Sequence, residues 1–176
     1  MSRLELAFAR IQHWDERVCV RMNGALRYAA VQPAFRAVSW LGNGILWYSL
    51  MFALLLQYGV QAALPVLHMA LVGMACTLAY KLLKRGTLRP RPFQALRAVA
   101  AGAGVLDAFS FPSGHTLHAV AFTIVACSYY PMLAVPLGSF TLLTAASRVI
   151  LGLHYPSDVL AGAAIGATLA GLSLGI

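Results

Sequence analysis

Long runs of residues without a charged side chain dominate this sequence. Lys, Arg, Asp and Glu are absent from residues 37–80, 108–147 and 159–176, which are 44, 40 and 18 residues long. A helix that crosses the hydrocarbon core of a bilayer needs about 20 predominantly apolar residues. The first two runs are therefore each long enough for two membrane-spanning helices, and the last run for one.

Turn-forming residues divide the two longer runs at positions that suit short connections. The first break lies near residues 57–65 and the second at 129–136, where Pro131 and Pro136 flank the turn,. The pattern predicts an all-α integral-membrane bundle with about five transmembrane helices. The expected spans are residues 43–60, 63–83, 115–130, 133–152 and 156–176.

The first 40 residues have a different pattern, because arginines interrupt every apolar stretch. The apolar residues recur at three-to-four or doubled spacing: Leu4, Phe8, Ile11, Val18, Met22 and Leu26. This spacing predicts amphipathic N-terminal helices at the membrane surface. An equally good interpretation is a helix that packs on the protein's own exposed face. The arginines also argue against a cleaved signal peptide.

Composition agrees with a single membrane domain over residues 1–176. Hydrophobic residues make up 60% of the chain and charged residues only 10%, with a mean hydropathy of +0.75. Thirteen Lys and Arg against five Asp and Glu give a net charge of +8. Such a charge suits binding to a nucleic acid or to an anionic membrane, and the high hydropathy favours the membrane. The three cysteines are far apart and predict neither a disulfide framework nor a metal site.

The expected topology brings two polar segments to one face of the bundle. Residues 84–114 form an unusually long connection between the second and third spans, and residues 148–157 connect the fourth and fifth. A basic cluster opens the longer loop: Lys84, Arg85, Arg89, Arg91 and Arg97. By itself the cluster is best interpreted as the accumulation of Lys and Arg at cytoplasmic helix ends or as attraction to lipid headgroups.

Two groups of residues on this face suggest phosphate chemistry. In the first, Ser113 is a predicted N-cap and Gly114 offers a backbone amide at a helix N-terminus, which is a favourable place for phosphate. His115 follows as a candidate proton donor. In the second, Asp158 lies one helical turn after His154 and can either stabilise the start of its helix or accept a hydrogen bond from the imidazole, leaving the other ring nitrogen free to attack.

Three blocks of residues together resemble the type 2 phosphatidic acid phosphatase (PAP2) family. They are Lys84, six residues, Arg91-Pro92; Pro112-Ser113-Gly114-His115; and Ser147-Arg148, five residues, His154, three residues, Asp158. All eleven positions match. Family members commonly have six spans, and this chain is expected to replace the first with its N-terminal surface helices.

The resemblance implies a role for each site residue. His154 resembles the nucleophile that forms a phosphohistidine intermediate, Asp158 orients it, and His115 protonates the leaving oxygen and then activates water. The residues that resemble the phosphate-binding cradle are Lys84, Arg91, Ser113, Gly114 and Arg148. No metal or other cofactor is implied, because side-chain cations neutralise the phosphoryl oxygens. His118, one turn after His115, is a candidate supporting residue, whereas His13 and His68 are expected to be structural.

The expected function is hydrolysis of a membrane lipid phosphate or pyrophosphate, with a polyprenyl or glycerolipid phosphate favoured. Two alternatives are a lipid-binding membrane protein without catalysis and the vanadate-dependent chemistry of related haloperoxidases, which are soluble. The substrate and oligomeric state stay open. We expect a multi-pass protein of the plasma (inner) membrane, and the distribution of Lys and Arg favours a cytoplasmic active site.

Overall fold

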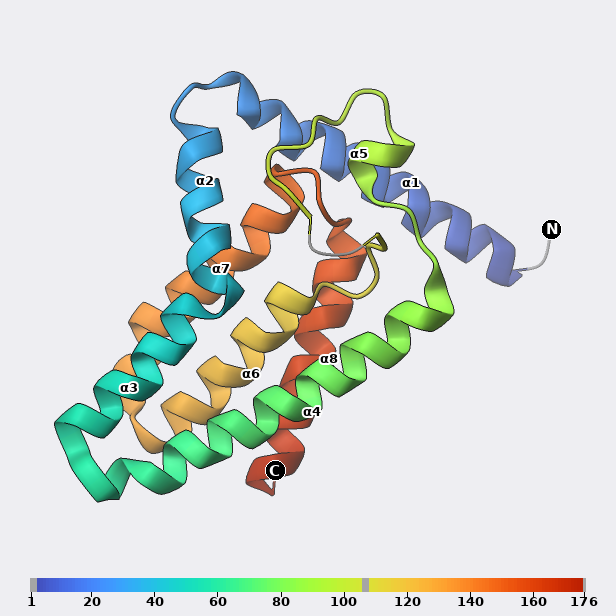
Figure 1. Cartoon of the computed structure of the whole chain (residues 1–176). Helices are drawn as coiled ribbons and strands as arrows, with labels where there is room; N and C mark the ends of the chain where they lie inside the picture. The colour runs from blue at the N-terminus through green and yellow to red at the C-terminus, as the bar shows by residue number, and fades with distance from the viewer. Residues whose placement is uncertain (1–2, 106–107, 176) are drawn as a thin grey trace.

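A computed structural model describes residues 3–105 and 108–175 and shows a bundle of helices with a layer of loops at one end (Figure 1). No strand occurs in these two ranges, which confirms the all-α prediction. The helices are α1 (Arg3–Asn23), α2 (Val31–Trp40), α3 (Leu46–Tyr58), α4 (Ala63–Thr87), α5 (Pro92–Ala95), α6 (Gly114–Tyr129), α7 (Ala134–Ile150) and α8 (Pro156–Leu174).

The central helix is α6, which packs against α4, α7 and α8. The buried core lies around it and includes Trp47, Met69, Leu117, Phe122 and Val125. Many apolar side chains on the outside of the bundle are exposed, such as Val60 at 91% and Val135 at 78%. Exposed apolar surface on this scale suits contact with lipid rather than water.

Three helical stretches in the described part of the chain are long and apolar enough to cross a membrane. They are Val31–Ala95, Pro131–Ile150 and Pro156–Leu174. The first stretch contains α2, α3, α4 and α5; a π-helical segment, Leu41–Ile45, joins α2 to α3, and a 3-10 turn, Gly59–Ala62, joins α3 to α4. The expected spans at 63–83, 115–130, 133–152 and 156–176 coincide with α4, α6, α7 and α8, apart from residue 176, which lies outside the described residues.

The helices of the N-terminal region, expected up to residue 40, also pack on the bundle. Helix α2 packs against α7 and continues through a π-helical segment, Leu41–Ile45, into α3. The segment bends at Gly44, whose φ of 116° favours glycine,. The amphipathic pattern did not distinguish a helix at the membrane surface from one on the bundle, and α2 lies on the bundle.

Helix α1 combines both interpretations of the N-terminal pattern. Its residues 3–14 are exposed, whereas Asp15, Cys19 and Asn23 are buried against the bundle. The helix lies across the end of the bundle that carries the long loop, and the C-terminus lies at the opposite end (Figure 1).

Candidate active site

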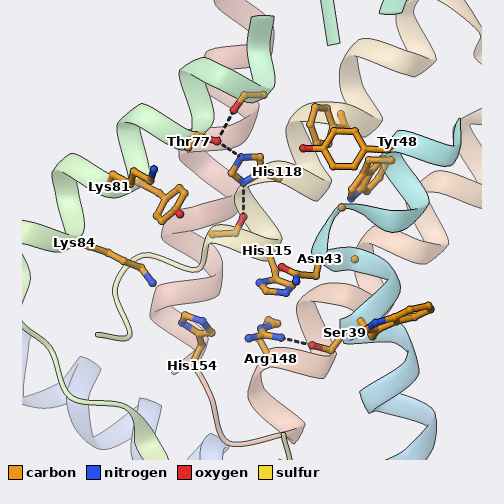
Figure 2. A pocket seen from close by; sticks show the side chains of 18 of the residues that line it. Ser39, Asn43, Tyr48, Thr77, Lys81, Lys84, His115, His118, Arg148 and His154 are labelled. Atoms are coloured by element: carbon orange, nitrogen blue, oxygen red, sulfur yellow. Dashed lines mark hydrogen bonds between the residues drawn. The ribbon is translucent and has the colours of Figure 1, made fainter. Parts of the chain in front are cut away.

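The two polar segments that the sequence places on one face do meet in the structure. The end of α4, the loop from 88 to 113, the start of α6 and the turn between α7 and α8 come together at the same end of the bundle (Figure 1). Figure 2 shows Lys84, His115, Arg148 and His154 directed toward a common space. These four residues come from four different segments of the chain.

The turn that carries His154 has a local cause in the sequence. After α7 ends at Ile150, the backbone amides of Leu153 and His154 both donate to the carbonyl of Arg148, at 3.0 and 3.1 Å. Gly152 has a φ of 71°, and a Cβ there would lie 2.6 Å from the carbonyl oxygen of Ala100. A glycine is therefore required for the chain to turn back toward the site.

The imidazole of His154 is buried, with 2% of the residue exposed. Nη1 of Arg91 donates to the carbonyl of Leu153 at 2.7 Å and lies 3.3 Å from Nε2 of His154. Because a guanidinium has only donors, Nε2 is the acceptor and its lone pair faces the cationic site. Burial and the nearby Arg148, Arg91 and Lys84 lower the pKa of His154 well below its ordinary value, so the ring is neutral and available as a nucleophile,.

Asp158 lies beside His154 but is held mainly by other groups. Its Oδ2 is 3.8 Å from Nδ1 of His154, beyond hydrogen-bond distance,. The same oxygen accepts from the backbone amide of Tyr155 at 2.8 Å, and Oδ1 accepts from Nη1 of Arg89 at 2.6 Å. Asp158 therefore stabilises the start of α8, one of its two expected roles, and the expected hydrogen bond to His154 is not formed in this structure.

Three cationic side chains line the site although they are buried. Lys84, Arg91 and Arg148 are 8%, 2% and 4% exposed. Nζ of Lys84 donates to the carbonyl of Phe109 at 3.2 Å, and Nη1 of Arg148 donates to Oγ of Ser39 at 2.5 Å. Positive charge gathered in a region of low dielectric constant favours the binding of an anion.

The start of α6 matches the sequence prediction in position but not in every contact. Ser113 is the N-cap residue, yet its hydroxyl makes no capping hydrogen bond and instead lies 3.0 Å from Oγ1 of Thr116. The residue is fully buried and does not line the cavity, whereas Gly114 and His115 do. Nδ1 of His118 donates to the carbonyl of Gly114 at 2.8 Å, which supports the first turn.

One cavity of about 1190 Å³ contains the site and extends along the bundle. Six of the eight predicted site residues line it: Lys84, Arg91, Gly114, His115, Arg148 and His154. Ser113 and Asp158 lie behind its wall. Of the wider basic cluster, Arg85 also lines the cavity, whereas Arg89 and Arg97 do not.

The sequence analysis missed several residues of this cavity that come from α2, α3, α4 and the π-helical segment between α2 and α3. Ser39, Asn43, Tyr48, Thr77 and Lys81 line it together with apolar side chains such as Trp47 and Met51. Figure 2 shows Thr77 beside His118 and Asn43 beside His115, and Nε2 of His118 lies 3.0 Å from Oγ1 of Thr77. The available signal was a polar Asn43-Gly44 pair inside an apolar run.

Fold and site together define a class of protein: a helical integral-membrane protein with a buried histidine and a cationic site at one end of a largely apolar cavity. Comparison with known proteins identifies the family. The model of the PAP2 superfamily matches residues 49–176. This chain belongs to the PAP2 superfamily.

Sequence relatives and solved structures agree with this assignment. Undecaprenyl-diphosphatase BcrC of Bacillus subtilis is 35% identical over 117 residues, which are 66% of this chain and 60% of that protein. Decaprenylphosphoryl-5-phosphoribose phosphatase of Mycobacterium tuberculosis is 36% identical over 90 residues, or 50% of this chain and 48% of that protein. The chain thus spans less than two thirds of these relatives.

Two crystal structures have the same fold as this chain over most of their length. The PAP2-type phosphatidylglycerolphosphate phosphatase of Bacillus subtilis has a TM-score of 0.77 and 26% identity, covering 98% of this chain and 90% of that one. LpxE of Aquifex aeolicus has the same TM-score and identity, covering 89% of this chain and 93% of that one. Both similarities include the N-terminal half of the bundle.

Proposed function

We propose that this protein is a membrane phosphatase that hydrolyses the phosphate or diphosphate of a lipid through a phosphohistidine intermediate. The observation that carries the proposal is the composition of the cavity that contains the site. Its polar end holds His154, His115 and three buried cations, and its walls include apolar side chains of α3, α4 and α6. A charged headgroup and an apolar tail require this combination in one site.

The geometry supports a two-step reaction. Nε2 of His154 attacks phosphorus, the bond to the leaving oxygen breaks, and His115 gives that oxygen a proton. His115 then accepts a proton from water, whose oxygen attacks phosphorus and breaks the phosphorus–nitrogen bond. Free phosphate leaves and both histidines return to their starting states.

The cations stabilise the charge on the transferred group. Lys84, Arg91 and Arg148 neutralise the phosphoryl oxygens, and the amide of Gly114 at the start of α6 donates to one of them. Catalysis of phosphoryl transfer consists mainly of such positioning and charge stabilisation. Side-chain cations supply this charge in the proposed reaction, so we expect activity without an added metal ion.

The lipid class that we favour is a polyprenyl or glycerolipid phosphate. The relatives named above act on undecaprenyl diphosphate, a decaprenyl phosphoribose and phosphatidylglycerolphosphate, according to their names. The loops of this chain are short outside residues 88–113, which leaves little protein for recognising a large sugar headgroup. The lipid tail would lie along the apolar part of the cavity.

We also propose a multi-pass arrangement in the plasma membrane with the active site at the cytoplasmic face. Helices α4, α6, α7 and α8 run between the two ends of the bundle (Figure 1), and α3 precedes them as a fifth crossing. The 16 residues of α6 reach about 24 Å at about 1.5 Å per residue, close to the thickness of a thin hydrocarbon core.

The first experiment measures phosphate release by the detergent-purified protein in the presence of EDTA. The panel contains undecaprenyl diphosphate, phosphatidylglycerophosphate, phosphatidic acid and a soluble monoester. We expect release from a lipid, and a loss of about 10³-fold or more in His154→Ala. His13→Ala is the matched control, because His13 is exposed on α1 and outside the cavity.

The same variants test the covalent intermediate. Brief reaction with a lipid labelled in its phosphate should give a phosphoprotein that is stable in base and labile in acid, and His154→Ala should give none. Substantial turnover by His154→Ala would reject His154 as the nucleophile. An inactive wild-type protein that still binds these lipids would instead favour a lipid-binding role.

A further inference from the structure

Helix α1 lies outside the part of the chain that matches the family model, yet its buried residues face the catalytic turn. The model match begins at residue 49, whereas α1 ends at Asn23. Asp15, Cys19 and Asn23 are its three buried residues, spaced four apart on one face. Each of them contacts the segment from 150 to 158 that contains His154.

Asp15 is the centre of these contacts. The residue is fully buried, and its carboxylate accepts from Nη2 of Arg89 at 2.7 Å and from the backbone amide of Ser157 at 2.9 Å. The hydroxyl of Ser157 donates to the same carboxylate. A carboxylate from α1 therefore binds both the long loop and the first turn of α8.

Arg89 connects Asp15 to the catalytic residues. Its Nη1 donates to Oδ1 of Asp158 at 2.6 Å and to Oγ of Ser157 at 2.8 Å, while its Nη2 binds Asp15. The guanidinium also lies 4.0 Å from the ring centre of Tyr155, the residue that follows His154. The guanidinium of Arg89 thus joins the buried carboxylates of Asp15 and Asp158. Because its donors are planar and rigidly spaced, it fixes the position of one carboxylate relative to the other.

Cys19 and Asn23 extend the contact along the turn. Sγ of Cys19 lies 3.7 Å from the carbonyl oxygen of His154 and can donate its proton there. Burial, together with Asp15 and Asp158, raises the pKa of Cys19 to about 12, so the thiol keeps this proton. Nδ2 of Asn23 donates to the carbonyls of Ala100 and Ile150, both at 2.9 Å, and so connects α1 to the end of α7.

We propose that Asp15, acting through Arg89, is a positioning residue that holds the turn carrying His154 in its reactive geometry. The inference rests on the proposed function, because it assigns Asp15 to the nucleophile of that reaction. Asp15 does not line the cavity that holds the phosphate cradle. Its loss should therefore change the alignment of His154 while the cationic cradle keeps its affinity for phosphate.

The test is the variant Asp15→Asn, which keeps the shape of the side chain but removes its charge. We expect kcat to fall by about 10- to 100-fold, the size of effect that a displacement of about 1 Å at a reacting group causes. The KM for the lipid and the inhibition constant of inorganic phosphate should each change by less than about threefold. The reason is that the substitution leaves the affinity of the cationic cradle for phosphate unchanged. Glu16→Gln is the matched control, because Glu16 is partly exposed on the same helix and its carboxylate accepts from Gln12 of that helix.

A double-mutant cycle separates positioning from general damage. Arg89→Lys keeps the positive charge but loses the bidentate geometry, and it should lower kcat to a similar extent. If Asp15 acts through Arg89, the double variant loses little more than either single variant. Independent, additive losses would overturn the proposed route through Arg89.

Other results also distinguish the two proposals. Wild-type kcat in Asp15→Asn would overturn the positioning role while leaving the phosphatase function intact. A parallel loss of thermal stability, phosphate affinity and kcat would overturn it as well, since it would mean that Asp15 only holds the fold together. An inactive wild-type protein would contradict the proposed function itself, and Asp15 would then have no reaction to position.

Discussion

At the scale of single residues, the proposed reaction depends on two histidines that lie beside the same cations. His154 is buried in the turn after α7 and accepts from Arg91 through Nε2, whereas His115 is partly exposed at the start of α6, and both line the cavity. The two rings reach the cavity from different segments, which suits the separate roles of nucleophile and proton donor. The three motif blocks predicted both residues, because their chemistry is encoded in residue type and spacing.

The role of His115 as proton donor predicts a dependence on the leaving group. In His115→Asn, kcat/KM for an alkyl phosphate should fall by about 10²-fold or more, the usual contribution of general acid catalysis. The loss for an aryl phosphate with an acidic leaving group should be much smaller, because that oxygen needs no proton. Equal losses for both substrates would indicate that His115 binds phosphate instead.

The environment of His154 predicts its titration. Histidine NMR of the free protein, assigned with His154→Asn, should show this ring neutral at pH 6.5 and charged only at much lower pH. Because the unfolded chain binds this proton near pH 6.5 and the folded protein does not, the contribution of His154 to stability decreases as the pH falls below that value. A ring that is already half charged at pH 6.5 would contradict the described geometry.

At the scale of secondary-structure elements, close contact between α6 and α8 sets the distance between His115 and His154, the two histidines of the proposed reaction. Gly162 and Gly166 lie one turn apart on α8 and face the backbone of α6. A Cβ at Gly162 would lie 2.5 Å from the carbonyl oxygen of Ser113, and one at Gly166 would meet the carbonyl of Leu117. This is the small-residue spacing that allows close approach of helices in membranes.

Substitution at this contact should therefore change both stability and activity. Gly166→Ala is expected to destabilise the protein by about 1–3 kcal/mol through overpacking, and to lower kcat because α6 carries His115. Gly138→Ala on α7 is the control, since no neighbour lies within 4 Å of its Cβ position. The measurements are the thermal unfolding and the lipid hydrolysis of both variants. Equal stability and equal kcat in the two variants would show that α6 and α8 can move apart without loss of stability or activity.

At the scale of the whole molecule, positive charge is gathered at the end that carries the site. Every Lys and Arg lies in α1 and the turn after it, in α2, at the ends of α4 and α7, or in the loop between α4 and α6: Arg3, Arg10, Arg17, Arg21, Arg27, Arg36, Lys81, Lys84, Arg85, Arg89, Arg91, Arg97 and Arg148. Several of these cations serve the site, but those of α1 do not line the cavity. The arginines of α1 therefore favour a cytoplasmic location for this end.

This distribution predicts the orientation of the C-terminus. A pair of topology reporters fused after residue 176, one active only outside the cytoplasm and one only inside, should report an external C-terminus. Retained phosphatase activity of the fusions serves as the control for correct insertion. Activity of the internal reporter alone would place the active site on the outer face.

Much of the fold and site could be predicted from the sequence because it depends on local properties. Charge-free runs of sufficient length predict membrane helices, and α4, α6, α7 and α8 lie where those runs placed them. Residue type and spacing predicted the family and six of the residues that line the cavity. The short-range turn at Gly152 and the start of α8 at Pro156 likewise follow from local backbone preferences.

Only the tertiary structure decided the contacts between distant segments. Ser39 reaches Arg148 across 109 positions, and Asp15 reaches Arg89 across 74 and Ser157 across 142. An amphipathic pattern shows that a helix has a face to bury but not which surface covers it, so both interpretations of residues 1–40 stayed open, and the packing of α2 on α7 comes from the structure. The sequence by itself therefore determined the membrane class and which residues are candidates for the reaction, and the packing of helices decided what holds those residues in place.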